Sequence, residues 1–188
     1  LVSGTYRLME YTGTETLPFS GGIVGLNTRD AAALDETTPG QVNLIVTAGV
    51  AQNLAWNPVV DGNWDLGTLN WVDAATQMVT NRFYDLDTVR FDNAGAFNGA
   101  VVLTTGLRPA SIFVTGDSNY TFSGTGTLSN SPAGPLVIGK DGAGTLTIAN
   151  TNGFTGGIVV SNGTLAAGSA GAFGSGPVTP LGGLPTPG

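Results

Sequence analysis

The chain has 188 residues, of which 41% are hydrophobic, only 10% are charged and 30 are glycine. Its formal net charge is −7, and the six basic residues are scattered, which argues against binding to nucleic acid or to an anionic membrane. Histidine and cysteine are both absent, which excludes Ser-His-Asp and Cys-His catalysis, His-ligated metal sites and disulfides.

The composition favours turn-rich all-β structure, because the chain is too apolar to remain a solvated tail. We predict an all-β fold in which C-terminal coils of a parallel β-helix, a solenoid, follow a β-rich capping or sandwich region. No apolar run is long enough for a transmembrane helix, and the first residues do not resemble a signal peptide. Four regions are predicted: an N-terminal β-rich segment (1–55), a Trp-containing β region with the first coils (56–123), a solenoid repeat (124–179) and a Pro/Gly tail (180–188).

In the first region, strands are predicted at residues 5–11 and 41–47. Residues 21–40 between them are expected to form a long loop. The run Ala31-Ala32-Ala33-Leu34 favours helix, so one short helical turn is predicted over residues 30–35.

The second region contains all three tryptophans, Trp56, Trp64 and Trp71. Together with Phe83 and Tyr84 they allow two interpretations: an exposed aromatic platform for sugar rings, or a buried cap that closes the first coil. We favour the cap. Turn clusters separate further predicted strands. These strands are expected at residues 88–91, 100–104, 111–114 and 120–122.

The third region contains an internal repeat. The triplet Gly-Thr-Leu occurs at residues 126–128, 144–146 and 163–165. A second series of apolar triplets interleaves with it, at residues 112–114, 136–138 and 158–160. Two strand series with a period of roughly 20 residues predict a parallel β-helix with two or three strands per coil.

One segment, residues 142–178, has a specific pattern of glycines and short β-branched runs. Its main positions are Gly144, Thr145, Leu146, Gly156, Gly157, Gly163, Thr164 and Leu165. The pattern resembles the autotransporter-associated β-strand repeat of passenger-type bacterial surface proteins. This resemblance implies a parallel β-helix that serves as a rigid stalk, secreted or on the cell surface.

The densest carboxylates are Asp85, Asp87 and Asp92, which lie close in sequence to Arg82 and Arg90. Acidic loops on secreted β proteins often supply calcium ligands, so these three are weak candidates for a calcium site. Their spacing matches neither an EF-hand nor the nonapeptide calcium repeat. We favour carboxylates that cap turns or pair with arginine, and we expect no other cofactor.

We therefore expect a non-enzymatic structural element whose partners are further copies of the chain or other surface proteins. An uncapped last coil near Val178 would leave an unpaired strand row, to which a second copy could add head-to-tail and build a filament. The added strand would be residues 5–11 or the Pro/Gly tail. The alternatives are a glycan-binding adhesin that uses the tryptophans and, third, a β-helix enzyme acting on polysaccharides. No acid–base pair supports the enzyme, and Lys140-Asp141 is interpreted as a turn.

Overall fold

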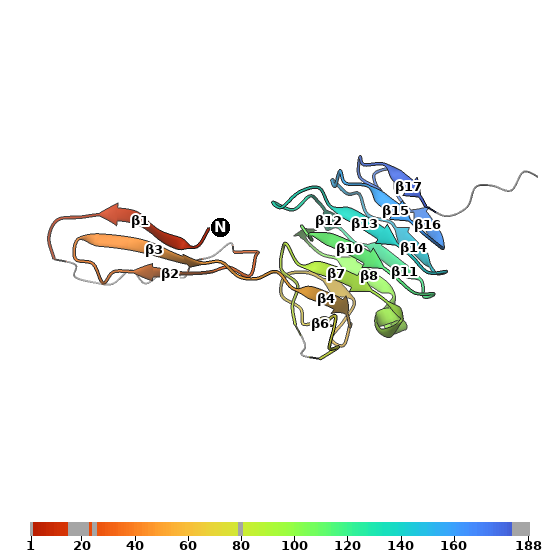
Figure 1. Cartoon of the computed structure of the whole chain (residues 1–188), viewed down its shortest axis with the longest axis horizontal. Helices are drawn as coiled ribbons and strands as arrows, with labels where there is room; N and C mark the ends of the chain where they lie inside the picture. The colour runs from red at the N-terminus through yellow and green to blue at the C-terminus, as the bar shows by residue number, and fades with distance from the viewer. Residues whose placement is uncertain (1, 15–22, 24–25, 79–80, 182–188) are drawn as a thin grey trace, which may run out of the picture. The chain divides into compact units, whose positions relative to one another are not determined.

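The computed structural model describes residues 2–14, 23, 26–78 and 81–181 (Figure 1). The fold is nearly all-β, with about four parallel coils between residues 88 and 180, which confirms the predicted fold class. The chain divides into two compact units, Leu1–Val50 and Ala51–Gly188. The predicted tail lies outside the described residues from position 182 onward. In the described part, none of the helical structure has the length and apolarity needed to cross a membrane.

The first unit is a three-stranded antiparallel sheet with the strand order β1-β3-β2. Its strands are β1 (Gly4–Glu10), β2 (Ala31–Asp35) and β3 (Gln41–Thr47). The two predicted strands are confirmed, but the predicted helical turn is wrong because Ala31–Asp35 forms β2 and pairs along β3. A single helical turn is unstable in isolation, whereas β2 gains a ladder of backbone hydrogen bonds with β3.

The second unit is a solenoid whose largest sheet has seven strands in the order β17-β15-β13-β10-β7-β4-β6. All neighbouring pairs are parallel except β4 and β6. The strands stack as successive rungs in Figure 1. They are β4 (Asn53–Trp56), β6 (Trp71–Asp73), β7 (Thr88–Phe91), β10 (Ser111–Val114), β13 (Val137–Lys140), β15 (Ile158–Val160) and β17 (Val178–Pro180).

Two further sheets complete the coils, both with parallel pairing. The five-stranded sheet has the order β16-β14-β11-β8-β5, and a small sheet pairs β12 with β9. Their strands are β5 (Asn63–Trp64), β8 (Ala100–Leu103), β9 (Gly106–Leu107), β11 (Tyr120–Ser123), β12 (Thr127–Leu128), β14 (Thr145–Ile148) and β16 (Thr164–Ala167). A short 3-10 helix, η1 (Asn93–Asn98), forms one corner, where a turn was predicted.

The register of the coils differs in part from the predicted repeat. Leu146 pairs with Leu165, so the second and third Gly-Thr-Leu triplets do stack. The first triplet does not belong to this series, because Thr127–Leu128 pairs with β9 in the small sheet. In the other series Ile138 pairs with Ile112 and with Ile158, so the predicted triplet 136–138 is displaced by two residues.

The core runs through the coils because strand side chains alternate between the inside and the outside. Most inward positions carry branched aliphatic or aromatic side chains that are buried along the stack. Examples in neighbouring coils are Ile112, Ile138 and Ile158, each at most 1% exposed. Stacking therefore supplies the burial that strands of two to four residues cannot obtain alone.

Glycine is required where the corners of successive coils touch. Gly142 and Gly163 have φ values of +84° and +81°. A Cβ atom on Gly142 would lie 2.2 Å from the carbonyl oxygen of Gly116, and one on Gly163 would lie 2.2 Å from that of Gly142. The left-handed backbone and the close approach both exclude a larger side chain, which explains part of the glycine content.

Candidate functional site

The three tryptophans lie inside the second unit, at the end where the parallel ladder begins. Trp56 is 1% exposed, and Trp64 and Trp71 are fully buried. The ring centroid of Trp64 lies 5.3 Å from that of Trp71 and 5.4 Å from that of Phe83, in edge-on contacts. A sugar platform requires exposed ring faces, so these buried rings give no support to the adhesin alternative.

At the same end, the seven-stranded sheet finishes in antiparallel pairing. Strand β6 runs antiparallel to β4, with Trp56 opposite Trp71. On its other side, Trp71 forms a bridge with Asn81 through two backbone hydrogen bonds of 3.2 and 2.6 Å. The first rung is therefore covered by a chain segment of opposite direction, which ends the parallel ladder.

The buried side-chain amide of Asn70 supports this cap, and its role is not evident from the sequence. Asn70 is fully buried and donates to Asp61 Oδ1 at 2.8 Å and to the Asn63 carbonyl at 3.0 Å. A backbone hydrogen bond from Asn63 lowers the pKa of Asp61, with smaller contributions from side-chain hydrogen bonds of Asn70 and Asn63, while burial opposes the shift. The Asp-Gly-Asn turn before Trp64 was the available signal in the sequence.

The aspartates that were predicted as calcium ligands accept hydrogen bonds from groups of the protein itself. Asp87 is fully buried, and its two oxygens accept from the amides of Gln52 at 2.8 Å and Tyr84 at 2.9 Å. Asp85 accepts from the Arg108 amide at 2.9 Å, and burial raises the pKa of Asp85. Both carboxylates therefore accept hydrogen bonds from backbone amides.

Asp92, the third candidate, caps the start of η1 by accepting from the Ala94 amide at 2.9 Å. Its other oxygen pairs with Arg90 Nε at 2.9 Å. Among the residues that the structure describes, no three acidic side chains gather closely enough to hold a metal ion. Calcium binding at these aspartates stays a prediction without a geometric basis.

Side-chain hydrogen bonds join each coil to the next. The acceptors are asparagine or aspartate oxygens, and the amides they bind lie 24 to 26 residues away in sequence. One joint lies in the interior, where Asn152 accepts from the Leu128 amide at 2.8 Å and donates to the Ala172 carbonyl at 2.7 Å. The others lie at corners: Asn93 with Asp117 and Ser118, Asp117 with Ala143, Asn119 with Thr145, and Asn130 with Thr155.

The single lysine of the chain is part of a corner. Lys140 is 1% exposed, and its ammonium donates to the carbonyls of Gly142 at 2.6 Å, Asp141 at 3.2 Å and Asn162 at 3.2 Å. Burial lowers the pKa of Lys140, while the charges of Asp141 and Asp117 oppose the shift. The ammonium joins two successive corners, since Asn162 belongs to the next coil.

The predicted repeat residues occupy this same part of the solenoid. Thr145 pairs with Thr164, and Leu146 pairs with Leu165, so β14 and β16 lie in register. Gly156 and Gly157 form the corner before β15, and Gly144 and Gly163 form the corners before β14 and β16. The repeat thus contributes stacked strands and tight corners rather than a cluster of reactive groups.

Comparison with known proteins gives one match. Residues 139–167 match the family model described as passenger-associated-transport-repeat. No curated protein and no solved structure matches the chain. The matched residues extend from β13 through β14 and β15 to β16, which are two strands in each of two successive coils. This match confirms the resemblance to an autotransporter passenger repeat that the sequence predicts.

Proposed function

We propose that the chain is a stiff structural element of an autotransporter passenger, secreted or displayed on the cell surface. The observation that carries the proposal is that the passenger repeat at residues 139–167 forms in-register parallel coils. Each coil is held by backbone ladders, by a shared apolar core and by the side-chain joints between coils. A stack of this kind resists bending and leaves few segments open to proteases.

A mechanical role also agrees with the chemistry of the described residues. The aspartates that were candidates for a site bind backbone amides, and the only lysine binds carbonyl groups. We therefore propose that this chain has a structural rather than a catalytic role.

Surface labelling tests the proposed location and role. In bacteria that produce the full-length protein, an antibody against this chain should label intact cells or the culture medium. Protease added to whole cells should leave a resistant fragment that contains residues 139–167. Labelling that appears only after lysis, or rapid loss of this fragment while the cells stay intact, would contradict the proposal.

We further propose that copies of the chain associate head-to-tail through the C-terminal edge of the solenoid. In the described part of the chain, β17 and β16 end their sheets and pair on one side only. The Leu181 amide donates to the Val160 carbonyl, so the backbone groups of Val178 and Pro180 point away from β15. Proline has no N–H, so Pro180 weakens this edge as an acceptor of a new strand.

Unlike β17, β16 has no proline at its outer edge, so its outward backbone N–H groups are all present. The Gly168 amide donates to the Ile148 carbonyl, so Leu165 and Ala167 direct their N–H and C=O groups outward. At the opposite end, β6 pairs antiparallel with β4 and terminates the parallel ladder of the seven-stranded sheet, whereas β5 ends the five-stranded sheet and pairs with β8 alone among the described strands. Strand β1 is an edge strand that pairs with β3 alone among the described strands, and we propose it as the added strand.

Two edge variants test this association. Ala167→Pro removes an outward N–H from β16, and Pro180→Ala adds one to β17. In sedimentation and negative-stain microscopy of the full chain, we expect oligomers for the natural sequence, monomers for Ala167→Pro and longer assemblies for Pro180→Ala. Monodisperse monomers for both the natural sequence and Pro180→Ala at high concentration would rule out the filament.

A further inference from the structure

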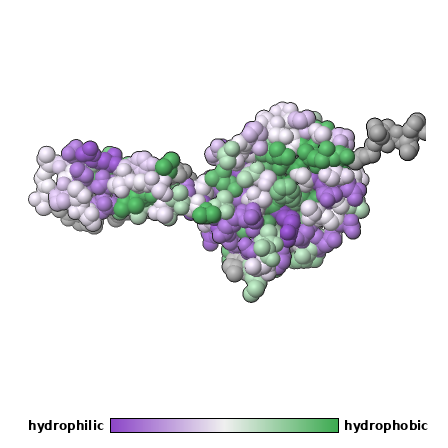
Figure 2. Space-filling view, in the orientation of Figure 1, coloured by the Kyte–Doolittle hydropathy of each residue, from purple (hydrophilic) through white to green (hydrophobic). Residues whose placement is uncertain are grey.

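The outer face of the seven-stranded sheet carries an apolar trough around Phe113. Phe113 is 46% exposed although it lies in the middle of β10, and Val137 on the neighbouring strand is 40% exposed. Figure 2 shows apolar side chains gathered over β13 and β15. Apolar side chains on one face of a sheet that lack cover are a common mark of a binding surface.

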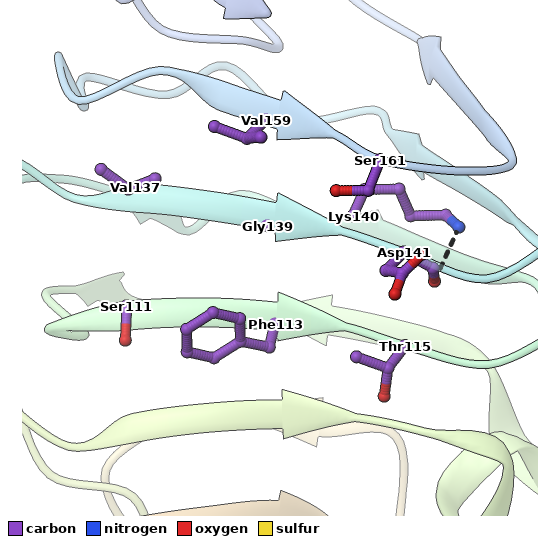
Figure 3. A pocket seen from close by; sticks show the side chains of 9 residues that line it. All are labelled: Ser111, Phe113, Thr115, Val137, Gly139, Lys140, Asp141, Val159 and Ser161. Carbon is purple, nitrogen blue, oxygen red and sulfur yellow. Dashed lines mark hydrogen bonds between the residues drawn. The ribbon is translucent and has the colours of Figure 1, made fainter. Parts of the chain in front are cut away.

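The trough exists because a glycine lies beside the aromatic ring. Phe113 pairs with Gly139, and Gly139 pairs with Val159, so these three positions form one row across successive coils. Figure 3 shows the Phe113 ring lying along the sheet next to Gly139. A hollow of about 360 Å³ lies over Gly139, and Phe113 also lines a second hollow of about 350 Å³ on the side of β7. Each lies within the roughly 300–1,000 Å³ typical of ligand sites.

The positive charges that line the trough are already paired. Arg90 binds Asp92 at 2.9 Å and the Ala74 carbonyl at 3.0 Å. The ammonium of Lys140 points into a corner, where it binds three carbonyl groups. Asp141 adds a negative charge, and the chain as a whole has a net charge of −7. An anionic ligand is therefore disfavoured. The Asp141 carboxylate accepts from the Gly142 amide at 2.8 Å and interacts with the charge of Lys140, so the trough offers no uncompensated charge to a cation either, and an uncharged ligand fits the site.

The polar groups that remain are small and hydroxyl-rich. Ser111, Thr115 and Ser161 line the trough, and Ser111 already shares a hydrogen bond of 3.2 Å with Thr88. The backbone groups of these strands lie in the plane of the sheet and pair with the neighbouring coils. A peptide therefore finds no free strand edge here to extend, whereas a sugar ring needs only an apolar surface and nearby hydroxyls.

We propose that this trough binds a neutral polysaccharide, with the Phe113 ring against the apolar face of one sugar residue. The two hollows on either side of Phe113 accept the neighbouring sugar residues, so that the glycan crosses the strands along the stack. The hydroxyls of Thr115 and Ser161 bind its hydroxyl groups. This function is additional to the structural role, and it uses a surface separate from the buried tryptophans.

The test measures binding of neutral oligosaccharides to the full chain. Cellohexaose, maltohexaose, laminarihexaose and mannohexaose are titrated by calorimetry, and amide NMR shifts locate the contact. We expect saturable binding of at least one of them, with shifts in β10, β13 and β15. Phe113→Ala should weaken that binding about tenfold or more, the usual loss for a central aromatic contact. Gly139→Leu, which fills the hollow beside the ring, should weaken it as well.

Phe97→Ala is the matched control, since Phe97 is 67% exposed in η1 and lines neither hollow. It should bind the oligosaccharide as the natural chain does. Absence of saturable binding to all four oligosaccharides would overturn the proposal, and so would unchanged binding in a folded Phe113→Ala variant. A dimer of the natural chain that Phe113→Ala dissociates would also overturn it, by assigning the face to a second copy. None of these outcomes bears on surface labelling or on the solenoid itself.

Discussion

The side chain of Asn152 accepts a hydrogen bond from the amide of Leu128, 2.8 Å away and 24 residues earlier in the chain. The same side chain donates to the carbonyl of Ala172 at 2.7 Å, 20 residues later. One amide therefore joins three successive coils in the closed interior, where water cannot replace it. Because these hydrogen bonds lie in the interior of the solenoid, their loss on substitution of Asn152 should be costly.

Asn152→Ala should lower the free energy of unfolding by about 2 kcal/mol or more, because it leaves the Leu128 amide and the Ala172 carbonyl buried without partners. Asn119→Ala removes a comparable hydrogen bond at an exposed corner, where water can bind the freed amide of Thr145. Its cost should be about 1 kcal/mol or less. Urea unfolding followed by tryptophan fluorescence reports the second unit alone, since all three tryptophans belong to it. Equal costs for the two variants would contradict this account.

The aromatic cap predicts that substitutions of Trp56 and Trp64 lower the free energy of unfolding by different amounts. Trp64→Ala should cost about 3–5 kcal/mol or prevent folding of the second unit, because a large buried side chain is lost. Trp56 Nε1 donates to the Asn98 carbonyl at 3.2 Å, whereas Trp64 Nε1 has no partner among the described residues. Trp56→Phe should therefore cost more than Trp64→Phe, by about 1 kcal/mol. Lost sugar binding in a stable Trp64→Ala variant would instead favour the adhesin alternative.

The cap also predicts a pH dependence at Asp61. Its pKa lies below the usual value of 3.8, chiefly because the ionised carboxylate accepts the Asn63 amide. A depressed pKa in the folded state means that the contribution to stability is present above pH 3.8 and is lost as the pH falls through the folded pKa. Asp61→Asn should thus be less stable than the natural chain at neutral pH, and the gap in urea midpoint should close in acid. A gap that does not change with pH would show that ionisation of Asp61 contributes nothing.

The stacked corners predict that glycines are not interchangeable. Gly163→Ala places a Cβ atom 2.2 Å from the Gly142 carbonyl oxygen at a φ of +81°, which should cost about 2 kcal/mol or more. Gly106→Ala is the control, since a Cβ atom there meets Thr127 Oγ1 only at 3.7 Å. It should be neutral or stabilise by up to about 1 kcal/mol. Thermal unfolding of both variants checks the contrast, and equal effects would contradict the described corner geometry.

Most of the fold could be predicted from the sequence because it depends on local patterns. The predicted strands 88–91 and 111–114 match β7 and β10, since β-branched and aromatic residues between turn clusters define them. The register could not be read in the same way. Coils that differ in length by several residues shift the stacking, and Ile138 rather than Leu136 pairs with Ile112.

The sites were harder to predict because they depend on contacts between coils. Buried Asn152 and Asn70 look like ordinary turn residues in the sequence, yet each is bonded to groups several residues or a whole coil away. The trough at Phe113 depends on Gly139, which is 26 residues distant in sequence and becomes a neighbour only through parallel pairing. Short strand β2 was missed for the same reason, since its stability comes from its partner β3.

The most direct measurement of the central claim uses paired cysteines, since the natural chain has none. The parallel register places Thr145 beside Thr164 and Thr147 beside Ala166, at the strand spacing of about 4.8 Å that permits a disulfide. Under oxidation, the pairs Thr145→Cys with Thr164→Cys and Thr147→Cys with Ala166→Cys should each cross-link rapidly. The exchanged pairs, 145 with 166 and 147 with 164, should not. Rapid cross-linking of the exchanged pairs instead would mean antiparallel strands and would contradict the stacked solenoid.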